Sequence, residues 1–216
     1  MTLRTATPLQ VVEDSEPSRR CWSLRGGSRI IALVDGTGSG SVPIMGRDDW
    51  AEAQPLCSER LVLEPLRVEH ADEMAPLLDD PTLHTFTGGK PATLEELRSR
   101  YARQVVGQPP DGSQHWLNWI VRRRDDGQAV GFVQATISEQ NGDLTADVAW
   151  VVAVSQQRSG YAREAAHLMT DWLRLQQVRL VVAHVHPQHH ASNAVARWIG
   201  LTPTDTQVDG EVRWQG

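Results

Sequence analysis

The stretch "SQQRSGYAREAA", residues Ser155 to Ala166, directly follows the apolar run "VAWVVAV" at Val148 to Val154. Such an apolar run predicts a buried strand, and the alanines after the turn recur at helical spacing. The first turn of a helix has main-chain N–H groups without partners, and the helix dipole adds partial positive charge there. The order strand, small polar turn, helix therefore predicts an anion site.

Three residues of this turn suit a diphosphate. Gly160 has no Cβ, so a phosphate can approach the main chain closely, and Ala162 is small for the same reason. Arg158 can add a charge-assisted hydrogen bond to a phosphate oxygen. The turn is not a Walker loop, because no Gly-Lys-Ser/Thr closes it, and it lacks the Gly-x-Gly-x-x-Gly of dinucleotide-binding proteins.

The composition is that of an ordinary globular protein, with 216 residues, 40% hydrophobic and 22% charged. The net charge of -6 argues against a nucleic-acid partner. No run approaches the roughly 18 apolar residues of a membrane helix, and the N-terminus does not read as a signal peptide. We therefore expect a cytoplasmic protein without a membrane partner, in which Cys21 and Cys57 are free thiols.

Two parts of the chain differ in character. Residues 1–57 contain a candidate hairpin around "RGGS" and a Gly/Ser-rich linker, and we treat them as an N-terminal appendage. Residues 58–216 hold the main domain. There, Thr93 and Glu96 predict a capping box at the start of a helix.

The main domain alternates strand and helix patterns. Strands are predicted at 60–67, 115–123, 129–140, 144–154 and 178–186, helices at 68–80, 94–107, 161–177 and 190–200, and a last hairpin at 208–215. The unit strand, turn, helix, strand implies a right-handed crossover between parallel strands, while the meander before it is antiparallel. The sequence thus predicts an α/β fold with a mixed sheet.

The spacing Gln157-x-x-Gly160-x-Ala162 resembles the Gln/Arg-x-x-Gly-x-Gly/Ala motif of the GNAT superfamily, the acyl-CoA-dependent N-acetyltransferases. The strand before it and the helix after it are the context that this motif has in the family. Within the superfamily, the chain looks most like the branch that acetylates ribosomal-protein N-termini (RimJ/RimL-like), a branch that also contains enzymes acting on small amines.

A second segment, "HPQHHASNAVARWIGL", resembles the family pattern Pro-x-Asn-x-x-Ser, a helix, then Gly-Phe. Pro187, Ser192 and Gly200 fall in step with it. His189 stands where the family often has Asn, and Leu201 stands where it has Phe. The resemblance covers residues 58–216 and leaves the N-terminal appendage unexplained.

The resemblance implies a GNAT-like, mostly antiparallel sheet that is splayed between its fourth and fifth strands, with helices on both faces. Acetyl-CoA would be the co-substrate, with its pantetheine arm in the splay and its pyrophosphate on the turn. The residues implied to bind the coenzyme are Val152, Val154, Gln157, Arg158, Ser159, Gly160, Tyr161, Ala162 and His189. The resemblance implies no metal, and a homodimer.

Two residues are candidates for proton transfer. Asp147 stands where family members often carry a Glu, so it is the candidate base, acting directly or through a water. The alternative is a solvated strand Asp. The family's usual Tyr acid is replaced by Ala196, so Ser192 is the candidate acid; its alternative role is a cap in the first helical turn.

The acceptor pocket is harder to place. Trp116 and Trp119 are three apart on a strand, so they point to opposite faces and one of them belongs to the core. The other, with Phe86 and Gln134, is expected to bind the amine. The histidines from His184 to His190 invite a metal, but no carboxylate or Cys lies at ligand spacing.

These features favour an enzyme that transfers an acetyl group from acetyl-CoA to a primary amine by direct attack in a ternary complex. The amine would be a protein N-terminus or a small molecule. The alternative is a non-catalytic acyl-CoA sensor of the same fold. An intact coenzyme turn fits both, the missing Tyr favours the sensor, and Asp147 and Ser192 favour the enzyme.

Overall fold

The computed structural model describes residues 52–216. The expected hairpin and linker of the N-terminal appendage lie outside the described residues, as does Cys21. The sheet begins with a short strand at Leu56–Cys57, before the boundary that we expected at residue 58. Cys57 is disulfide-bonded, so the expectation of a free thiol there is wrong.

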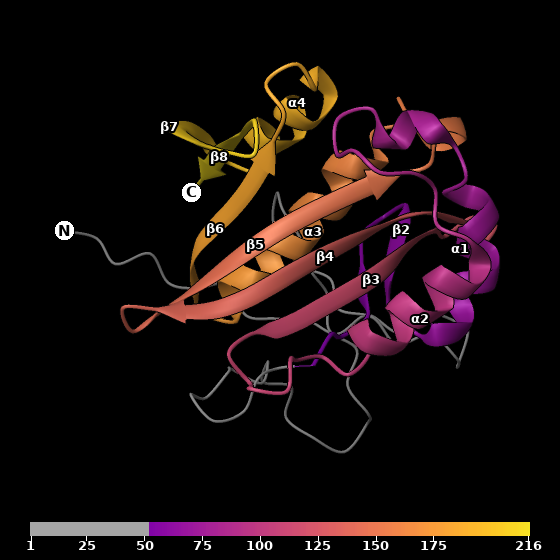
Figure 1. The fold of residues 1–216 in the computed structure, drawn as a ribbon, viewed down its shortest axis with the longest axis horizontal. Coiled ribbons are helices and arrows are strands. Elements are labelled where there is room, and N and C mark those ends of the chain that lie inside the picture. Colours follow the sequence, from indigo (N-terminus) through magenta and orange to yellow (C-terminus); the bar gives the residue numbers. More distant parts are fainter. Residues whose placement is uncertain (1–51) are drawn as a thin grey trace.

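The core of the described part, residues 52–216, is one eight-stranded sheet in the order β1-β2-β3-β4-β5-β6-β8-β7 (Figure 1). All neighbouring strands are antiparallel except β5 and β6. The strands are β1 (Leu56–Cys57), β2 (Leu61–Pro65), β3 (His115–Arg123), β4 (Ala129–Gln140), β5 (Asp143–Val152), β6 (Val178–Val185), β7 (Thr202–Val208) and β8 (Glu211–Gln215). The predicted mixed, mostly antiparallel sheet is confirmed.

The sheet splays between β5 and β6, as Figure 1 shows. The two strands pair only from Leu144↔Val178 to Asp147↔Val182. Beyond that point β6 continues beside β8, and residues 148–152 of β5 have no strand partner on that side within residues 52–216. Counted from β2, these are the fourth and fifth strands, so the predicted splay is confirmed.

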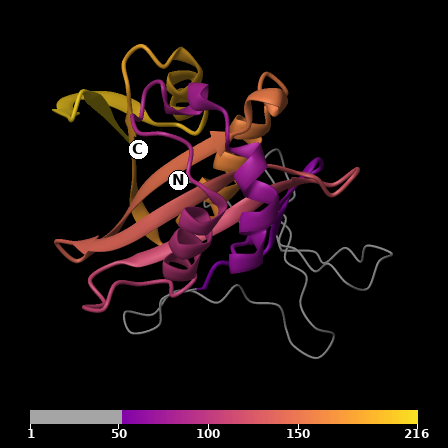
Figure 2. The same ribbon diagram turned by 45° about the vertical axis from the view of Figure 1, so that its right-hand side comes forward.

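Helices cover both faces of the sheet (Figures 1 and 2). They are α1 (Ala71–Leu77), α2 (Leu94–Gln104), α3 (Tyr161–Leu175) and α4 (His190–Trp198), with short 3₁₀ turns η1 (Val68–His70), η2 (Pro81–His84) and η3 (Val154–Gln156). Buried residues of α1 and α2 pack around Ile120, whereas those of α3 and α4 pack with Trp119 on the opposite face. No helix of the described part is long and apolar enough to cross a membrane.

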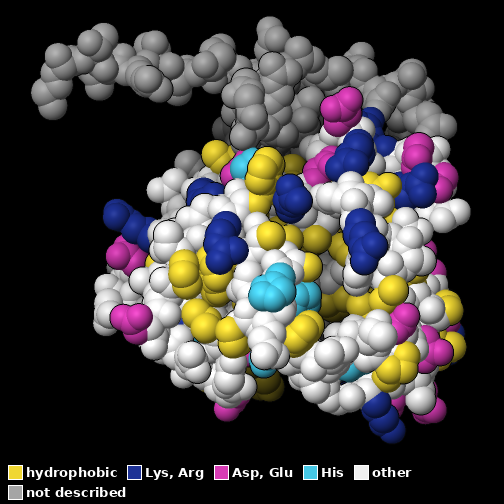
Figure 3. All heavy atoms as spheres, turned by 90° about the horizontal axis from the view of Figure 1, so that it is seen from above, with side chains coloured by type: hydrophobic (Ala, Val, Ile, Leu, Met, Phe, Trp, Pro, Cys, Tyr) yellow, Lys and Arg dark blue, Asp and Glu magenta, His cyan; other side chains and the backbone are white. Residues whose placement is uncertain are grey.

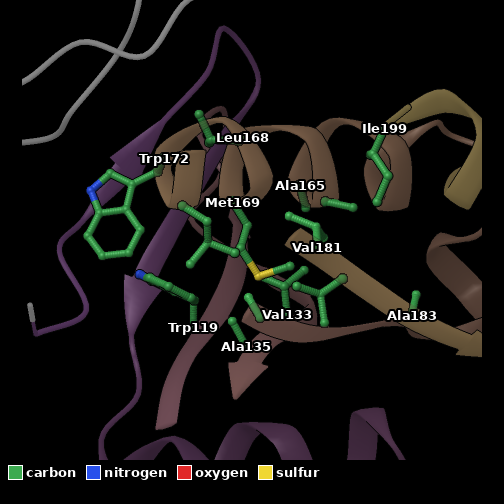
Figure 4. Packing of buried hydrophobic residues seen from close by; sticks show 14 of the residues in the cluster. Trp119, Val133, Ala135, Ala165, Leu168, Met169, Trp172, Val181, Ala183 and Ile199 are labelled. Carbon is green, nitrogen blue, oxygen red and sulfur yellow. The ribbon is translucent and has the colours of Figure 1, made fainter. Parts of the chain in front are cut away.

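The strand pattern did not decide whether Trp116 or Trp119 belongs to the core. The core beneath α3 contains Trp119. Trp119 is fully buried and meets Trp172 edge to face, with ring centroids 5.7 Å apart (Figure 4). Its indole N–H donates to the carbonyl of Gln54 over 2.8 Å. Trp119 is therefore the core tryptophan of the pair, and its expected place in the acceptor pocket does not fit the structure.

The capping box at Thr93 is formed as predicted. Thr93 Oγ1 accepts from the N–H of Glu96 (3.2 Å), and the Glu96 carboxylate accepts from the N–H of Thr93 (2.8 Å). We expect Thr93→Ala to lower the free energy of unfolding by about 1 kcal/mol, because one helix N–H loses its acceptor. Urea denaturation would measure this. Ser99→Ala, on the exposed side of the same helix, is the matched control and should cause no loss.

Candidate active site

The turn after β5 presents bare main chain to solvent. The strand ends at Val152, η3 follows, and both Arg158 (φ 64°) and Gly160 (φ 80°) are left-handed. Gly160 is the N-cap of α3, and no side chain caps the helix. The N–H groups of the first turn, Tyr161 and Ala162 included, therefore point outward without a capping side chain. This geometry fits the predicted anion site.

The segment between β1 and β2 braces this turn. Arg60, just before β2, donates from Nε to Glu164 in α3 (2.8 Å) and from Nη1 to the carbonyl of Ser159 (3.0 Å). Its guanidinium also lies 5.2 Å from the centre of the Tyr161 ring. Ser58 Oγ donates to the same Glu164 carboxylate over 2.6 Å. Sequence reasoning missed both residues, because they lie about a hundred positions away from the turn.

The brace supports a prediction for coenzyme binding. Arg60→Met should weaken acetyl-CoA binding by about fivefold, because the turn loses its tether and a nearby positive charge. Arg98→Met is a matched control. Like Arg60, Arg98 forms an ion pair with a carboxylate, that of Asp72, and the exposed fractions of the two side chains are similar, 53% for Arg98 and 50% for Arg60. Arg98 lies on α2 and does not contact the turn. Calorimetric titration of both variants would compare them. Equal affinities for the two variants would show that the brace does not serve the turn.

The free edge of β5 leads from the splay to the turn. Main-chain groups along a strand alternate between its two sides. Because the N–H of Ala153 donates to Val130 of β4 (2.9 Å), the groups of Val152 and Trp150 point into the splay. The carbonyl of Val152 accepts from Gln157 Nε2 (3.2 Å). Val154 lies in η3 and is 39% exposed, so it does not extend this edge.

One face of the sheet gathers the remaining polar candidates. Trp116 pairs with Thr136, and Thr136 pairs with Asp147, so the three side chains form one row across β3, β4 and β5. Gln134 lies in the next row on the same face, beside Asn118. All five side chains are half-buried. The structure thus brings Trp116, Gln134 and Asp147 to one surface.

Asp147 occupies the point where the sheet divides. It is the last residue of β5 that pairs with β6, and its carboxylate lies 3.8 Å from His184 Nδ1. Partial burial raises the pKa of Asp147, and electrostatic interactions with His184 and Arg213 oppose that rise. Its side chain is still 47% exposed. A carboxylate with a raised pKa that remains open to water suits the role of a proton acceptor.

Ser192 lies in a different environment, at the start of α4. His189 is the N-cap of this helix, and its Nδ1 accepts from the N–H of Ser192 (3.3 Å). His189 Nε2 lies 3.3 Å from Ser192 Oγ. Phe86, from the loop after η2, packs on the His189 ring with centroids 4.5 Å apart and on His186 at 5.1 Å. Phe86 is thus tied to the β6–α4 loop, which sequence reasoning did not foresee.

Histidines mark this part of the surface. Figure 3 shows them at the centre of one face, with hydrophobic side chains and a recess beside them. Asn193, buried beneath the loop, donates to the carbonyls of His186 (3.3 Å) and Pro187 (3.0 Å) and holds the loop in place. Among residues 52–216, no group of three or more His, Cys, Asp or Glu side chains converges as a metal site would require.

A family model described as the acetyltransferase (GNAT) domain matches residues 60–202, about two thirds of the chain. The chain belongs to the GNAT acetyltransferase family. The match begins at Arg60 and runs through the turn before α3 to the start of β7, so the family domain includes the turn, Asp147 and Ser192. A search of curated proteins finds no match to the sequence.

Solved structures share the GNAT fold at low sequence identity. An acetyltransferase from Agrobacterium tumefaciens is 23% identical, with a TM-score of 0.58, over 79% of this chain and 99% of that one. RimL, a ribosomal L7/L12 alpha-N-protein acetyltransferase in complex with coenzyme A, is 18% identical, with a TM-score of 0.61, over 74% and 94%. The self-immunity acetyltransferase MccE, in complex with acetyl-CoA and AMP, is 12% identical, with a TM-score of 0.59, over 74% and 93%.

Proposed function

We propose that this GNAT acetyltransferase uses acetyl-CoA as donor and acetylates a primary amine by direct attack in a ternary complex. The observation that carries the proposal is the uncapped, left-handed turn at Gly160, next to the splayed edge of β5. The coenzyme A in RimL and the acetyl-CoA in MccE support the choice of donor.

The turn would hold the pyrophosphate. The N–H groups of the first turn of α3 would donate to phosphate oxygens, with Arg158 and Arg60 supplying positive charge. The N–H of Val152 would donate to the pantetheine arm in the splay, while its carbonyl stays with Gln157. Val154 lies outside the strand. We therefore propose that the pantetheine arm contacts the main chain of Val152 and Trp150, and not that of Val154.

Asp147 and Ser192 would handle the protons. Asp147 takes a proton from the amine, directly or through a water, so that the nitrogen lone pair can attack the thioester carbonyl. A C–N bond forms, the C–S bond breaks, and the nitrogen releases its second proton to water. Ser192 O–H gives its proton to the leaving sulfur, so that coenzyme A leaves as the thiol, and water returns a proton to the serine oxygen. The two side chains would lie on either side of the splay, Asp147 on β5 and Ser192 on α4. The alternative roles are a solvated strand residue for Asp147 and a cap in the first helical turn for Ser192.

The acceptor would lie on the sheet face that carries Trp116 and Gln134. Both side chains share this face with Asp147, so an amine bound there is within reach of the base. The likeness to RimL, an enzyme named for protein alpha-amino groups, supports a peptide N-terminus as the acceptor. A small-molecule amine is the other candidate for the acceptor.

The non-catalytic sensor stays as the second candidate. One observation favours it: Ala196, at the position of the family's usual Tyr acid, is fully buried and offers no proton. A sensor would bind acetyl-CoA at the same turn without releasing coenzyme A. A thiol-release assay over peptides with different N-terminal residues, polyamines and amino acids tests both. Turnover with one class identifies an enzyme and its acceptor, while tight binding with no release throughout identifies a sensor.

The order of events has its own test. Direct attack in a ternary complex gives intersecting lines when initial rates are plotted against one substrate at several levels of the other. Parallel lines would point to a covalent acetyl-enzyme instead. A homodimer and a cytoplasmic location stay predictions, to be tested by sedimentation and by fractionation of cells.

A further inference from the structure

The sheet face that carries Asp147 continues across the splay onto the last strand. Asp147 pairs with Val182 of β6. Two residues further along β6, His184 lies on the same face and pairs with Arg213 of β8. Trp214, the neighbour of Arg213, is buried on the opposite face with α3 and α4. The side chains of Asp147, His184 and Arg213 therefore share one face.

Arg213 lies near the candidate base without pairing with it. Its strand neighbour His184 has Nδ1 3.8 Å from the Asp147 carboxylate. Burial raises the pKa of Asp147, and the electrostatic interaction with Arg213 is one of the two influences that lower it. Within residues 52–216, no ion pair joins Arg213 to this carboxylate or to any other. The guanidinium is thus close to Asp147 and still able to bind another anion.

The lack of a counterion distinguishes Arg213 from comparable arginines. Three arginines of residues 52–216 are half-buried, namely Arg122, Arg123 and Arg213. The first two each pair with carboxylates of neighbouring side chains. Arg213 does not, although Glu211 lies two residues earlier on the same face of β8. A partly buried charge is costly unless an opposite charge compensates it, so a ligand carboxylate would complete this site.

Polar and aromatic side chains face Arg213 from the other side of Asp147. The row Trp116, Thr136, Asp147 runs from β3 to β5, with Gln134 in the next row. Arg213 lies beyond Asp147, on the other side of the splay. An amine next to Asp147 therefore has an indole and an amide on one side and a guanidinium on the other. The guanidinium is a planar fork of N–H donors whose geometry matches a carboxylate.

We propose that Arg213 binds a carboxylate of the acceptor, so that the enzyme selects amines that carry a carboxylate a few bonds away. The inference rests on the proposed function, because it takes the amine to lie beside Asp147. Two sources offer this chemistry: the α-carboxylate of a free amino acid, and an acidic side chain at a peptide N-terminus.

Matched acceptors separate the two sources. Alanine is compared with alaninamide, and the dipeptide amide Asp-Ala with Asn-Ala, so that each pair differs in one carboxylate. Because the amines of a pair differ in basicity, the measured quantity is the ratio of kcat/KM within the pair. We expect Arg213→Gln to lower this ratio about thirtyfold for the pair whose carboxylate it binds, since a charge-assisted bidentate contact is lost. The pair that responds identifies the source.

Two further variants test whether the effect belongs to the charge at this position. Arg213→Lys keeps the charge without the fork, so it should lower the ratio only about threefold. Arg179→Gln is the matched control, because Arg179 is an exposed arginine of the neighbouring strand β6 that pairs with Asp143. It should leave both ratios unchanged, and all three variants should bind acetyl-CoA as the wild type does. If Arg213→Gln slows all four acceptors equally, the inference is overturned while acetyl transfer itself stands.

A binding measurement on the wild type distinguishes failure of this inference from failure of the proposed function. The acetylated forms of the four acceptors are titrated into the protein in the presence of coenzyme A, so no turnover is needed. We expect the carboxylate form of one pair to bind about thirtyfold more tightly than its amide partner. Equal affinities within both pairs would overturn the inference whether or not an amine is acetylated. A preference that Arg213→Gln removes, without turnover of any amine, would support the carboxylate site and contradict the proposed reaction.

Discussion

Replacing Gly160 with Glu is expected to abolish measurable binding of acetyl-CoA. The residue is the N-cap of α3, where main-chain N–H groups and the helix dipole attract an anion, and a carboxylate there would occupy and neutralise the site. Because Gly160 has φ 80°, any side chain at this position also strains the backbone by about 1 kcal/mol.

A second variant separates charge from strain. Gly160→Gln has the size and the backbone strain of Glu but no charge, and its Cβ would meet nothing closer than Arg60 Nη2 at 3.5 Å. We expect Gln to weaken binding about tenfold and Glu about a hundredfold or more, measured by calorimetric titration. Equal losses for both would mean that strain, and not the charge of the turn, governs binding.

Asp147→Asn is expected to lower kcat/KM for the amine about a hundredfold, because the amide cannot accept the proton and only solvent remains to do so. The variant should bind acetyl-CoA as the wild type does. Asp143→Asn is the matched control: Asp143 lies on the same face of β5, four residues away, and its carboxylate pairs with Arg179 at the exposed end of the strand. A fall of similar size in both variants would remove Asp147 from the mechanism.

The pKa of Asp147 adds a stability test with a defined sign. Its pKa is raised in the folded protein, so the unfolded chain releases this proton at lower pH than the folded one. The contribution of Asp147 to the free energy of unfolding therefore falls as the pH rises from the pKa of this group in the unfolded chain to its higher pKa in the folded protein. Asp147→Asn should be the more stable protein at neutral pH, and the difference should vanish in acid. Urea denaturation at both pH values would measure it.

Local patterns were enough to predict much of this fold. The capping box at Thr93, the meander of β3 to β5 and the helix after Gly160 each depend on residues close in sequence, and each is present. The splay between β5 and β6 is not visible in periodicity, because both strands remain apolar beyond Asp147. It followed only from the resemblance to the GNAT superfamily.

What the sequence did not reveal depends on contacts between distant residues. A period of two places Trp116 and Trp119 on opposite faces, but it does not say which face α3 covers. The brace from Arg60 to Glu164 and the contact of Phe86 with His189 join segments that no local pattern connects. The left-handed backbone at Arg158 is also unexpected, because residues other than glycine seldom adopt it.

Acetyl transfer can be followed directly with acetyl-CoA whose acetyl group is isotopically labelled. The label is incubated with the protein and an excess of the best amine of the thiol-release screen, and the products are separated by mass spectrometry. We predict that the label moves to the amine nitrogen at a rate that Asp147→Asn lowers and Asp143→Asn leaves unchanged. If the protein binds acetyl-CoA tightly and the label stays on coenzyme A with every amine class, the chain is a sensor and not an acetyltransferase.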